Sequence, residues 1–295
     1  MSPPGRVPSD WPNRAHSRSV QAGGLDWHVQ TIGSGPTLLL LHGTGASAHS
    51  WAGLVPQLAQ HFTLLMPDLP GHAFTLGARP ADLSLPRMAL ALTAMLEALQ
   101  LPAPLAVVGH SAGVALALRW ALDSANRGQT VLGFNPSLVA PPAVYMDWLA
   151  PLVNPVFTSA PMARLLSAVA GRTALIDRLL DSTGSTLSPA LRAPYRRLFS
   201  DQNHLRGSLG FMAAADLPAL LRDCAAAACT TAFVLGQQDR WVAEGALRRV
   251  ISKHLPQAAV QAWPAGHLLH EEQAPAAATW LLQQLAKTPA HTQAP

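Results

Sequence analysis

The sequence predicts an α/β fold in which helices cover both faces of a mostly parallel sheet. Three observations support this prediction. Short apolar runs of strand length alternate with longer segments of helical periodicity along most of the 295 residues. Some of these runs are apolar throughout, as in strands that are buried on both faces. A Gly-x-Ser-x-Gly pentapeptide from Gly109 to Gly113 separates an apolar run from a helical segment, a context typical of a sharp strand–turn–helix connection.

The individual elements follow from periodicity and from turn residues. Gly23 and Gly24 separate the first two strands and indicate a hairpin. The eight predicted strands are residues 19–22, 27–31, 37–41, 62–66, 105–108, 130–134, 231–235 and 259–263. The helices predicted between and after them are 46–60, 84–99, 114–122, 244–254 and 274–286, the second with Ser84 as its N-cap.

One long segment interrupts this alternation. Residues 135–228, which follow the sixth predicted strand, show helical patterns but no clear strand. A helical insertion at this place is expected to form a lid over the carboxyl ends of the strands, where such folds bind ligands. We therefore divide the chain into a first core part (1–134), a helical lid (135–228), a second core part (229–287) and a flexible tail (288–295).

Composition limits the class of protein. Hydrophobic residues make up 49% of the chain and charged residues 12%, with a formal net charge of +4. No apolar run approaches the roughly 18 residues of a membrane span, and no secretory signal is visible. The basic residues form only short clusters, which argues against a nucleic-acid partner. We expect a cytoplasmic protein with no transmembrane segment.

Ser111 is the expected nucleophile, at the tip of the turn between a strand and a helix. Gly109 and Gly113 stand where a Cβ would crowd the backbone of so tight a turn. The following helix directs its first amides and the positive end of its dipole toward the same spot. The alternative is a chance pentapeptide in a chain rich in glycine and alanine, which the flanking strand and helix disfavour.

A serine nucleophile requires a base and an acid. An imidazole accepts the hydroxyl proton, and a carboxylate fixes the imidazole tautomer. Asp239 follows the strand at 231–235 and His267 follows the strand at 259–263, in the order serine, acid, histidine. Taken singly, Asp239 could be a helix N-cap and His267 an incidental histidine. Together they predict a Ser111–His267–Asp239 triad, since the other usual acid position holds the uncharged Asn135.

An oxyanion hole requires two backbone donors. One is expected to be the amide of Ala112, the residue after the nucleophile. The other is expected to be the amide of Thr44 or Gly43, in the loop after the strand at 37–41. A tight turn at His42-Gly43 is the alternative interpretation, and the two are compatible.

These motifs together resemble the α/β-hydrolase superfamily, over nearly the whole chain. The matching segments are His42-Gly43, Asp68 to His72, Gly109 to Gly113, the loop at Asp239 and Gly266-His267. The resemblance implies an α/β-hydrolase fold, with a mostly parallel eight-stranded sheet, helices on both faces and a helical lid after the sixth strand. Ser111 distinguishes the chain from haloalkane dehalogenases and epoxide hydrolases, which have Asp there. Ala73 stands where the superfamily often has another glycine.

The chain is similar in more detail to the magnesium-chelatase accessory α/β-hydrolases of bacteriochlorophyll biosynthesis. The segments are Trp11 to Arg14, Trp27 to Gln30, His42 to Ser47, Gly71 to Thr75, Gly109 to Gly113 and Thr183-Gly184-Ser185. Those proteins are encoded among the pigment-synthesis genes of phototrophic bacteria. The resemblance implies work on, or beside, the insertion of magnesium into protoporphyrin IX. It implies a photosynthetic pathway rather than a defined reaction.

Three functions remain open. The first is a serine hydrolase of an ester or amide in the pigment pathway, the second a non-catalytic accessory protein that binds porphyrin or magnesium-chelatase subunits, and the third a generic carboxylesterase. The triad favours the first over the second, and the amino-terminal and lid motifs favour it over the third. No dinucleotide fingerprint, Walker motif or Cys/His cluster is present, so no cofactor and no metal is expected. Cys224 and Cys229 are expected to be packing residues.

The lid composition suggests a ligand. Aromatic and methionine side chains suit a small apolar ester or a large flat tetrapyrrole, although packing within the lid is the alternative. They are Tyr145, Met146, Trp148, Phe157, Met162, Tyr195, Phe199, Phe211 and Met212. Carboxylates at the margin of the ligand would meet basic residues of the lid, namely Arg192, Arg196, Arg197, His204 and Arg206.

Overall fold

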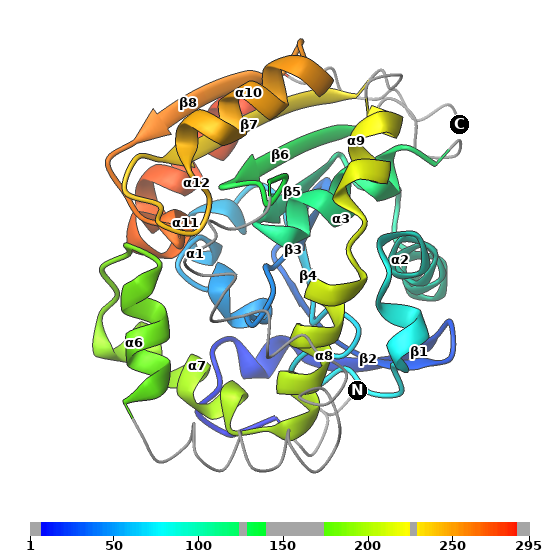
Figure 1. Ribbon diagram of the computed structural model, residues 1–295. Coiled ribbons are helices and arrows are strands. Elements are labelled where there is room, and N and C mark those ends of the chain that lie inside the picture. Colours follow the sequence, from blue (N-terminus) through cyan, green and yellow to red (C-terminus); the bar gives the residue numbers. More distant parts are fainter. Residues whose placement is uncertain (1–6, 124–128, 140–173, 225–228, 288–295) are drawn as a thin grey trace.

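The computed structural model describes residues 7–123, 129–139, 174–224 and 229–287. Eight strands form one sheet in the order β1-β2-β4-β3-β5-β6-β7-β8 (Figure 1). They are β1 (Ser17–Ala22), β2 (Leu25–Ile32), β3 (Thr37–Leu41), β4 (Thr63–Pro67), β5 (Ala106–His110), β6 (Thr130–Phe134), β7 (Thr230–Gly236) and β8 (Ala259–Trp263). β2 pairs antiparallel with β1 and β4, and the remaining pairs are parallel. The predicted mostly parallel, eight-stranded sheet is confirmed.

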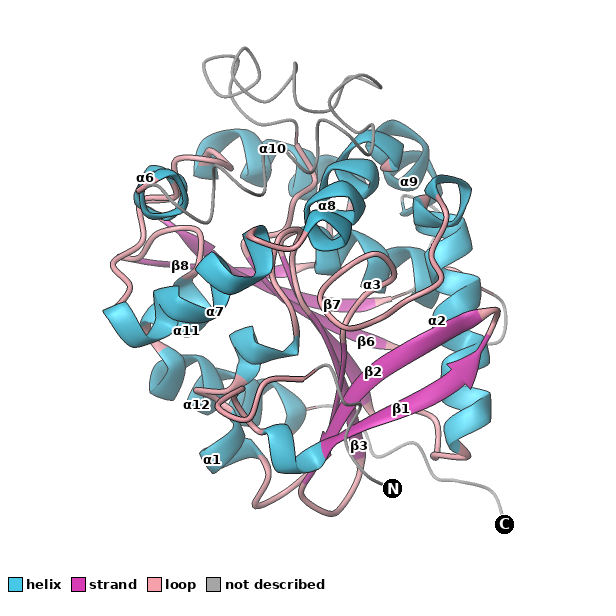
Figure 2. Cartoon of the chain, turned by 90° about the horizontal axis from the view of Figure 1, so that it is seen from below, coloured by secondary structure: helices cyan, strands magenta, loops and turns pink. Residues whose placement is uncertain are grey.

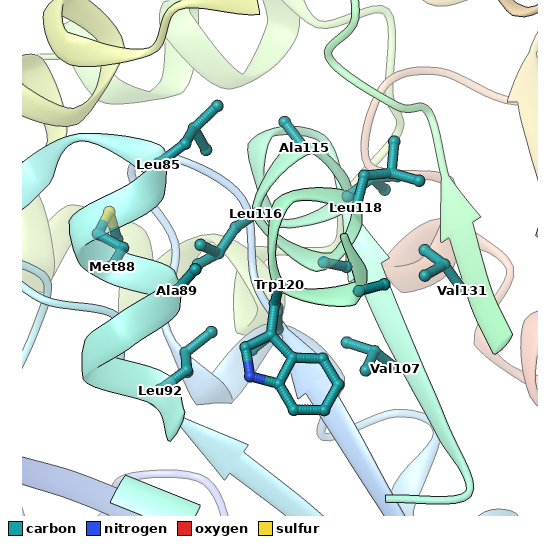
Figure 3. Close-up of a cluster of buried hydrophobic side chains, with 14 of the residues drawn as sticks. Leu85, Met88, Ala89, Leu92, Val107, Ala115, Leu116, Leu118, Trp120 and Val131 are labelled. Carbon is teal, nitrogen blue, oxygen red and sulfur yellow. The ribbon is translucent and has the colours of Figure 1, made fainter. Parts of the chain in front are cut away.

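Helices cover both faces of this sheet (Figure 2). On one face, α2 (Leu85–Leu99), α3 (Ala112–Ala121) and α10 (Glu244–His254) pack on inward side chains such as Leu39 and Val107. Figure 3 shows this cluster, with Trp120 between α2 and the strands. On the other face, α1 (Val55–Leu58) and α12 (Ala274–Leu285) pack on Leu38 and Val108. Alternate residues of one strand thus enter two cores, which explains why β3 is buried at every position and apolar from Leu38 to Leu41.

Several predicted elements agree with the structure to the residue. β3, β6, β8 and α10 have the predicted bounds, and the other elements except the predicted helix 46–60 shift by one or two residues at one or both ends. Gly23 and Gly24 have φ values of 58° and 77° and join β1 to β2 as the predicted hairpin, because glycine adopts this backbone without a Cβ clash. Ser84 lies at the N-cap of α2, but its side chain makes no capping hydrogen bond.

The helix predicted over 46–60 is wrong. The chain instead forms a 3-10 turn, η2 (Ala48–Trp51), followed by the single-turn α1. Pro56 lies in the first turn of α1, where its ring prevents the helix from extending back toward η2. The Ala48 amide donates to Asp68 Oδ1 at 2.8 Å, which satisfies one of the free donors at the start of η2.

The described part of the predicted lid is helical. It contains α6 (Leu175–Ser182), α7 (Pro189–Phe199), α8 (Gln202–Ala214) and α9 (Leu217–Cys224) between β6 and β7. α6 and α7 lie side by side (Figure 1), with Leu180 and Tyr195 in a common apolar cluster. α9 packs Leu220 and Cys224 into the same core as α3. The predicted tail at 288–295 and the lid residues Tyr145, Met146, Trp148, Phe157 and Met162 lie outside the described residues.

Candidate active site

The turn between β5 and α3 holds Ser111 in a strained conformation. Its φ is 52° and its ψ −119°, a region that non-glycine residues occupy at a cost of about 1–3 kcal/mol. A Cβ at Gly113 would lie 2.1 Å from the carbonyl oxygen of Leu41, and one at Gly109 would lie 2.6 Å from the amide nitrogen of Val114. The two glycines therefore allow the close backbone approach on which the turn depends, as predicted.

The structure brings together the three residues predicted as a triad. His267 Nε2 lies 3.0 Å from Ser111 Oγ, and His267 Nδ1 lies 2.7 Å from Asp239 Oδ2. Because a carboxylate only accepts, Nδ1 carries the proton and the Nε2 lone pair faces the hydroxyl. Asp239 Oδ1 accepts from the amides of Trp241 at 2.8 Å and Val242 at 2.9 Å. The carboxylate is thereby fixed by the turn that follows it.

Asn135 fixes the backbone that bears the histidine. Its side-chain nitrogen donates to the carbonyls of Gly266 at 2.9 Å and His267 at 2.8 Å, and its side-chain oxygen accepts from the Gly236 amide at 2.6 Å. Its φ is 44°, a backbone that asparagine tolerates better than most residues. In the sequence Asn135 stands out only by its missing charge, and no local pattern indicates this bridging role.

The predicted oxyanion donors lie beside the nucleophile. Thr44 and Ala112 line the same pocket as Ser111, and their amides have no hydrogen-bond acceptor within the described part of the chain. Gly43 does not line this pocket. A Cβ at Gly43 would lie 3.1 Å from Ser111 Cβ and 2.7 Å from His110 Nδ1, so Gly43 permits close packing against the nucleophile.

A buried histidine fixes the loop that holds Thr44. His42 Nδ1 donates to the Gly43 carbonyl at 2.8 Å, and Nε2 accepts from the Leu69 amide at 2.9 Å. Burial lowers the pKa of His42 to about 3, and the neighbouring His72 adds to this effect. The ring is therefore neutral near pH 7, in the tautomer that these two hydrogen bonds require.

The pocket at Ser111 is small and apolar. The described residues enclose a volume of about 90 Å³, and none of those lining it is Asp, Glu, Lys or Arg. The Trp241 ring stacks on His267, with ring centroids 5.7 Å apart and an interplanar angle of 30°. The other apolar walls come from the lid and from the loops after β7 and β8, namely Leu179, Leu180, Tyr195, Phe199, Met212, Val242 and Leu268. Of the described lid aromatics, only Phe211 packs in the core instead.

The basic residues of the lid do not serve this pocket, so our expectation for them is wrong. Arg192 pairs with Asp177 and Asp181, and Arg196 also pairs with Asp177. Arg197 pairs with Asp10, and Arg206 lines a separate cavity. His204 is buried, accepts from the Ala73 amide and donates to the Gly45 carbonyl. These side chains pair with other protein groups or lie outside the pocket, because the lid helices do not direct them toward Ser111.

Other predicted properties concern metals, membranes and cysteines. Among the described residues, no three His, Cys, Asp or Glu side chains are grouped so that they could hold a metal ion. None of the described helices has the length and apolar character needed to span a bilayer. Cys224 and Cys229 are free thiols. Burial raises the pKa of Cys224 to about 12, which suits the predicted packing role.

Comparison with known proteins gives a consistent result. The chain matches the alpha/beta hydrolase family over residues 38–279. The magnesium-chelatase 30 kDa subunit of Rhodobacter capsulatus is 34% identical over 280 residues, which cover 91% of this chain and 94% of that protein. The pimeloyl-[acyl-carrier protein] methyl ester esterase of Chromobacterium violaceum is 31% identical over 256 residues, which cover 84% and 94%.

A solved structure shows the same fold. A variant of the epoxide hydrolase from Solanum tuberosum superposes with a TM-score of 0.73 at 19% identity, covering 92% of this chain and 99% of that one. At such an identity the likeness concerns the fold alone. Together these matches confirm the predicted α/β-hydrolase fold and both family resemblances.

Proposed function

The chain belongs to the alpha/beta hydrolase family, and we propose that it is a serine hydrolase that cleaves a carboxylic ester. Ser111 is the nucleophile, His267 the general base and Asp239 the carboxylate that orients the imidazole. The continuous hydrogen-bond path from Ser111 Oγ through His267 to Asp239, beside an apolar pocket, is the observation that supports this proposal. Thr44 and Ala112 supply the oxyanion donors, and Gly43 lets the loop of Thr44 pack closely against the nucleophile.

The geometry suits acyl transfer in two steps. Ser111 Oγ attacks the ester carbonyl carbon while its proton passes to His267 Nε2, and the negative charge on the carbonyl oxygen meets the amides of Thr44 and Ala112. His267 then donates the proton to the leaving alkoxide, and an acyl-enzyme remains. Water then attacks the acyl carbon while His267 accepts its proton, and the carboxylic acid product leaves Ser111. Each amide contributes about 3 kcal/mol to transition-state stabilisation.

The pocket favours an uncharged group near the ester. A charged acyl group would lose its hydration there without gaining an opposite charge, since the described lining residues include no Asp, Glu, Lys or Arg. One relative of this chain is named a methyl ester esterase and another a magnesium-chelatase subunit. We propose that the substrate is an ester of the bacteriochlorophyll pathway and that the protein works in the cytoplasm beside magnesium insertion.

A second function is favoured by one observation. The 34% identity to a magnesium-chelatase subunit extends over 91% of the chain, which supports a binding role toward chelatase subunits or a tetrapyrrole. In this alternative the protein acts by binding, and hydrolysis by Ser111, His267 and Asp239 is secondary to that role. A generic carboxylesterase outside the pathway is the third possibility, and it would share the hydrolytic activity without tetrapyrrole or chelatase binding.

Hydrolysis and binding assays distinguish these functions. We expect wild-type protein to hydrolyse p-nitrophenyl acetate and Ser111→Ala to be inactive, whereas undiminished turnover in Ser111→Ala would refute the assignment. Protoporphyrin IX monomethyl ester should quench tryptophan fluorescence with a Kd below roughly 10 μM, which corresponds to about −7 kcal/mol. Binding without hydrolysis would favour the accessory role. Hydrolysis with neither tetrapyrrole binding nor capture of chelatase subunits would favour the generic esterase.

A further inference from the structure

A short segment at the end of α6 contacts both loops that bear the acid and the base. This segment, residues 182–185, belongs to the lid but packs on the core. The Thr183 carbonyl accepts from the His267 amide at 3.1 Å and from the Arg240 amide at 3.5 Å. One backbone carbonyl thus lies between the loop of His267 and the loop of Asp239.

Two serine side chains of the segment extend this contact. Ser185 Oγ accepts from the Leu268 amide at 2.8 Å, and Ser182 Oγ accepts from Trp241 Nε1 at 3.0 Å. Leu268 follows the catalytic histidine directly, and Trp241 is the residue that stacks on its ring. The 182–185 segment therefore fixes the imidazole through its backbone and through its stacking partner.

Glycines allow the backbones to touch without intervening side chains. Gly184 has a φ of 78°, and a Cβ there would lie 2.0 Å from the carbonyl oxygen of Gln238. On the opposite side, a Cβ at Gly266 would lie 2.3 Å from the amide nitrogen of Ser185. Gln238 and Gly266 immediately precede Asp239 and His267, so the segment sits between the acid and base loops with no free space on either side.

The same helix forms part of the pocket wall. Leu179 and Leu180 of α6 line the pocket at Ser111, and the Thr183 hydroxyl donates to the Leu180 carbonyl at 2.5 Å. Thr183 and Ser185 are both buried. A displacement of α6 would consequently move the pocket wall and the support of the two catalytic loops together.

We propose that residues 182–185 are positioning residues for the reaction, which hold the loops of Asp239 and His267 in the register that both hydrogen bonds of the triad require. Placement of the lid wall and alignment of the triad are thereby coupled. This inference rests on the proposed serine-hydrolase function. Thr183 also lines the pocket, but among the described contacts none of the four residues has a hydrogen bond to a side chain of the triad, so their effect is exerted through the loops of His267 and Asp239.

Graded substitutions test this role. Ser185→Ala removes the acceptor of the Leu268 amide, and Ser185→Thr retains an oxygen at the same place. Gly184→Ala introduces a Cβ against Gln238 and is expected to displace the acid loop. Ser188→Ala is the matched control, because Ser188 lies in the same part of the chain and caps α7 through the Leu191 amide, at 3.4 Å.

The rate constant for phosphonylation by a fluorophosphonate probe is measured on the full chain. A displacement near 1 Å reduces catalysis by roughly 100-fold, so we expect about a 100-fold decrease for Gly184→Ala and about a 10-fold decrease for Ser185→Ala. Ser185→Thr should recover most of the rate, and Ser188→Ala should match wild type. With p-nitrophenyl acetate, kcat should fall in Ser185→Ala while KM stays unchanged.

A second readout does not depend on turnover. The proton between His267 Nδ1 and Asp239 gives a low-field NMR resonance, which should shift or broaden in Ser185→Ala but not in Ser188→Ala. If folded Ser185→Ala keeps both the wild-type rate and the wild-type resonance, the positioning role is refuted. Should Gly184→Ala fail to fold, the positioning role is tested with Ser185→Ala and with Trp241→Phe, which removes the Nε1 donor to Ser182. If wild-type protein itself does not react with the probe, the proposed function is wrong, and the resonance still tests the positioning role.

Discussion

Two Ser–His–Asp arrays with nearly equal distances lie in this molecule. In the first, His267 bridges Ser111 and Asp239 at 3.0 and 2.7 Å. In the second, His28 bridges Ser17 and Asp68 at 2.9 and 2.7 Å. All six side chains are buried or nearly so. The hydrogen bonds alone therefore do not distinguish a candidate catalytic site from a structural one.

The surroundings of the serine make the difference. Ser17 lies within β1, does not line the described pockets, and accepts a further hydrogen bond from Gln30 Nε2 at 3.2 Å. Ser111 ends β5 with a φ of 52° and lines a pocket together with Thr44 and Ala112. A nucleophile needs an open approach and donors for the developing oxyanion. Of the two serines, Ser111 is the one that lies beside a pocket and beside amides with no acceptor in the described part of the chain.

Both aspartates accept two backbone amides besides their histidine, but those of Asp239 lie in the turn that follows it, whereas those of Asp68 come from two separate loops. Asp68 accepts from the Ala48 amide at 2.8 Å and the Phe74 amide at 3.2 Å as well as from His28. It thus joins β2, β4 and the loops beside the oxyanion donors. Burial raises the pKa of Asp68, but the interactions with His28 outweigh it and lower this pKa to about 2. We conclude that the Ser17 array stabilises the fold that supports the Ser111 array.

Removal of the two serine hydroxyls should give the largest contrast. Ser111→Ala is expected to abolish ester hydrolysis with little change in stability. Ser17→Ala should retain hydrolysis but lose about 1–2 kcal/mol of unfolding free energy, because His28 Nε2 loses its buried partner. Hydrolysis rates and urea denaturation of the two variants check this contrast, and an inactive but stable Ser17→Ala would break it.

Replacement of the two carboxylates should give the next largest effect. Asp239→Asn is expected to lower turnover by about 10⁴-fold in a folded protein, because the imidazole loses its correct tautomer and charge partner. Asp68→Asn should instead reduce the unfolding free energy on the order of 3 kcal/mol, with turnover per folded molecule preserved. Near-full activity of Asp239→Asn would place the acid elsewhere.

Glu271, on α11 (Leu269–Glu272), is a third buried carboxyl group. Unlike Asp68 and Asp239 it has no histidine as hydrogen-bond partner in the described part of the chain, and we expect it to make the unfolding free energy depend on pH. It accepts from the Tyr195 hydroxyl, and its other oxygen has no partner among the described residues. Burial raises the pKa of Glu271 from 4.5 to about 8, despite the hydrogen bond from Tyr195. Folded protein therefore keeps a proton that unfolded protein releases above about pH 4.5. This contribution to stability is complete below that pH and is lost as pH rises through 8.

Glu271→Gln should remove this loss. Between pH 6.5 and 8 we expect the unfolding free energy of wild type to decline by up to about 1.4 kcal/mol per pH unit relative to the variant. The buried histidines are the same in wild type and variant, so they do not mask the difference between the two. In six of them burial also lowers the pKa, so that their contribution changes below pH 6.5; they are His42, His49, His72, His110, His204 and His270. Denaturation curves at several pH values measure the slope, and equal slopes for both proteins would contradict the expectation.

The smallest effect concerns the loop that follows Asp68. Ala73 has a φ of 44°, which costs an L-residue about 1 kcal/mol more than glycine. Ala73→Gly should therefore raise the unfolding free energy slightly, with Tm higher by about 2 °C and turnover unchanged. Its main-chain hydrogen bond to His204 is retained. A lower Tm would show that the entropy of the unfolded glycine chain outweighs the relieved strain.

Much of the candidate site was predictable because its residues follow strands. Ser111, Asp239 and His267 each come directly or within a few residues after an apolar run, and parallel strands bring their carboxyl ends to one edge. β3 and β6 are buried at every position, and nearly continuous apolar runs mark such strands in the sequence. β8 contains Gln261 and is exposed or half-buried, so turn residues at its ends predicted its bounds instead.

The remaining features depend on which loops meet in space. The Asn135 amide, the 182–185 segment and the Ser17 array combine residues that lie far apart in the sequence and have no local pattern. Arg192 and Arg196 have the composition of ligand-binding residues, but neighbouring aspartates of α6 pair with them. The helix predicted over 46–60 failed because Pro56 has no amide proton to donate to the Ala52 carbonyl, a local signal that the apolar periodicity outweighed.

The central claim is that one of the two arrays is a nucleophilic site and the other is structural. Fluorophosphonate treatment followed by proteolysis and mass spectrometry tests it most directly. We predict a single adduct on the peptide that contains Ser111, none on the peptide that contains Ser17, and no labelling of Ser111→Ala. An adduct on Ser17, or undiminished labelling of Ser111→Ala, would contradict the account.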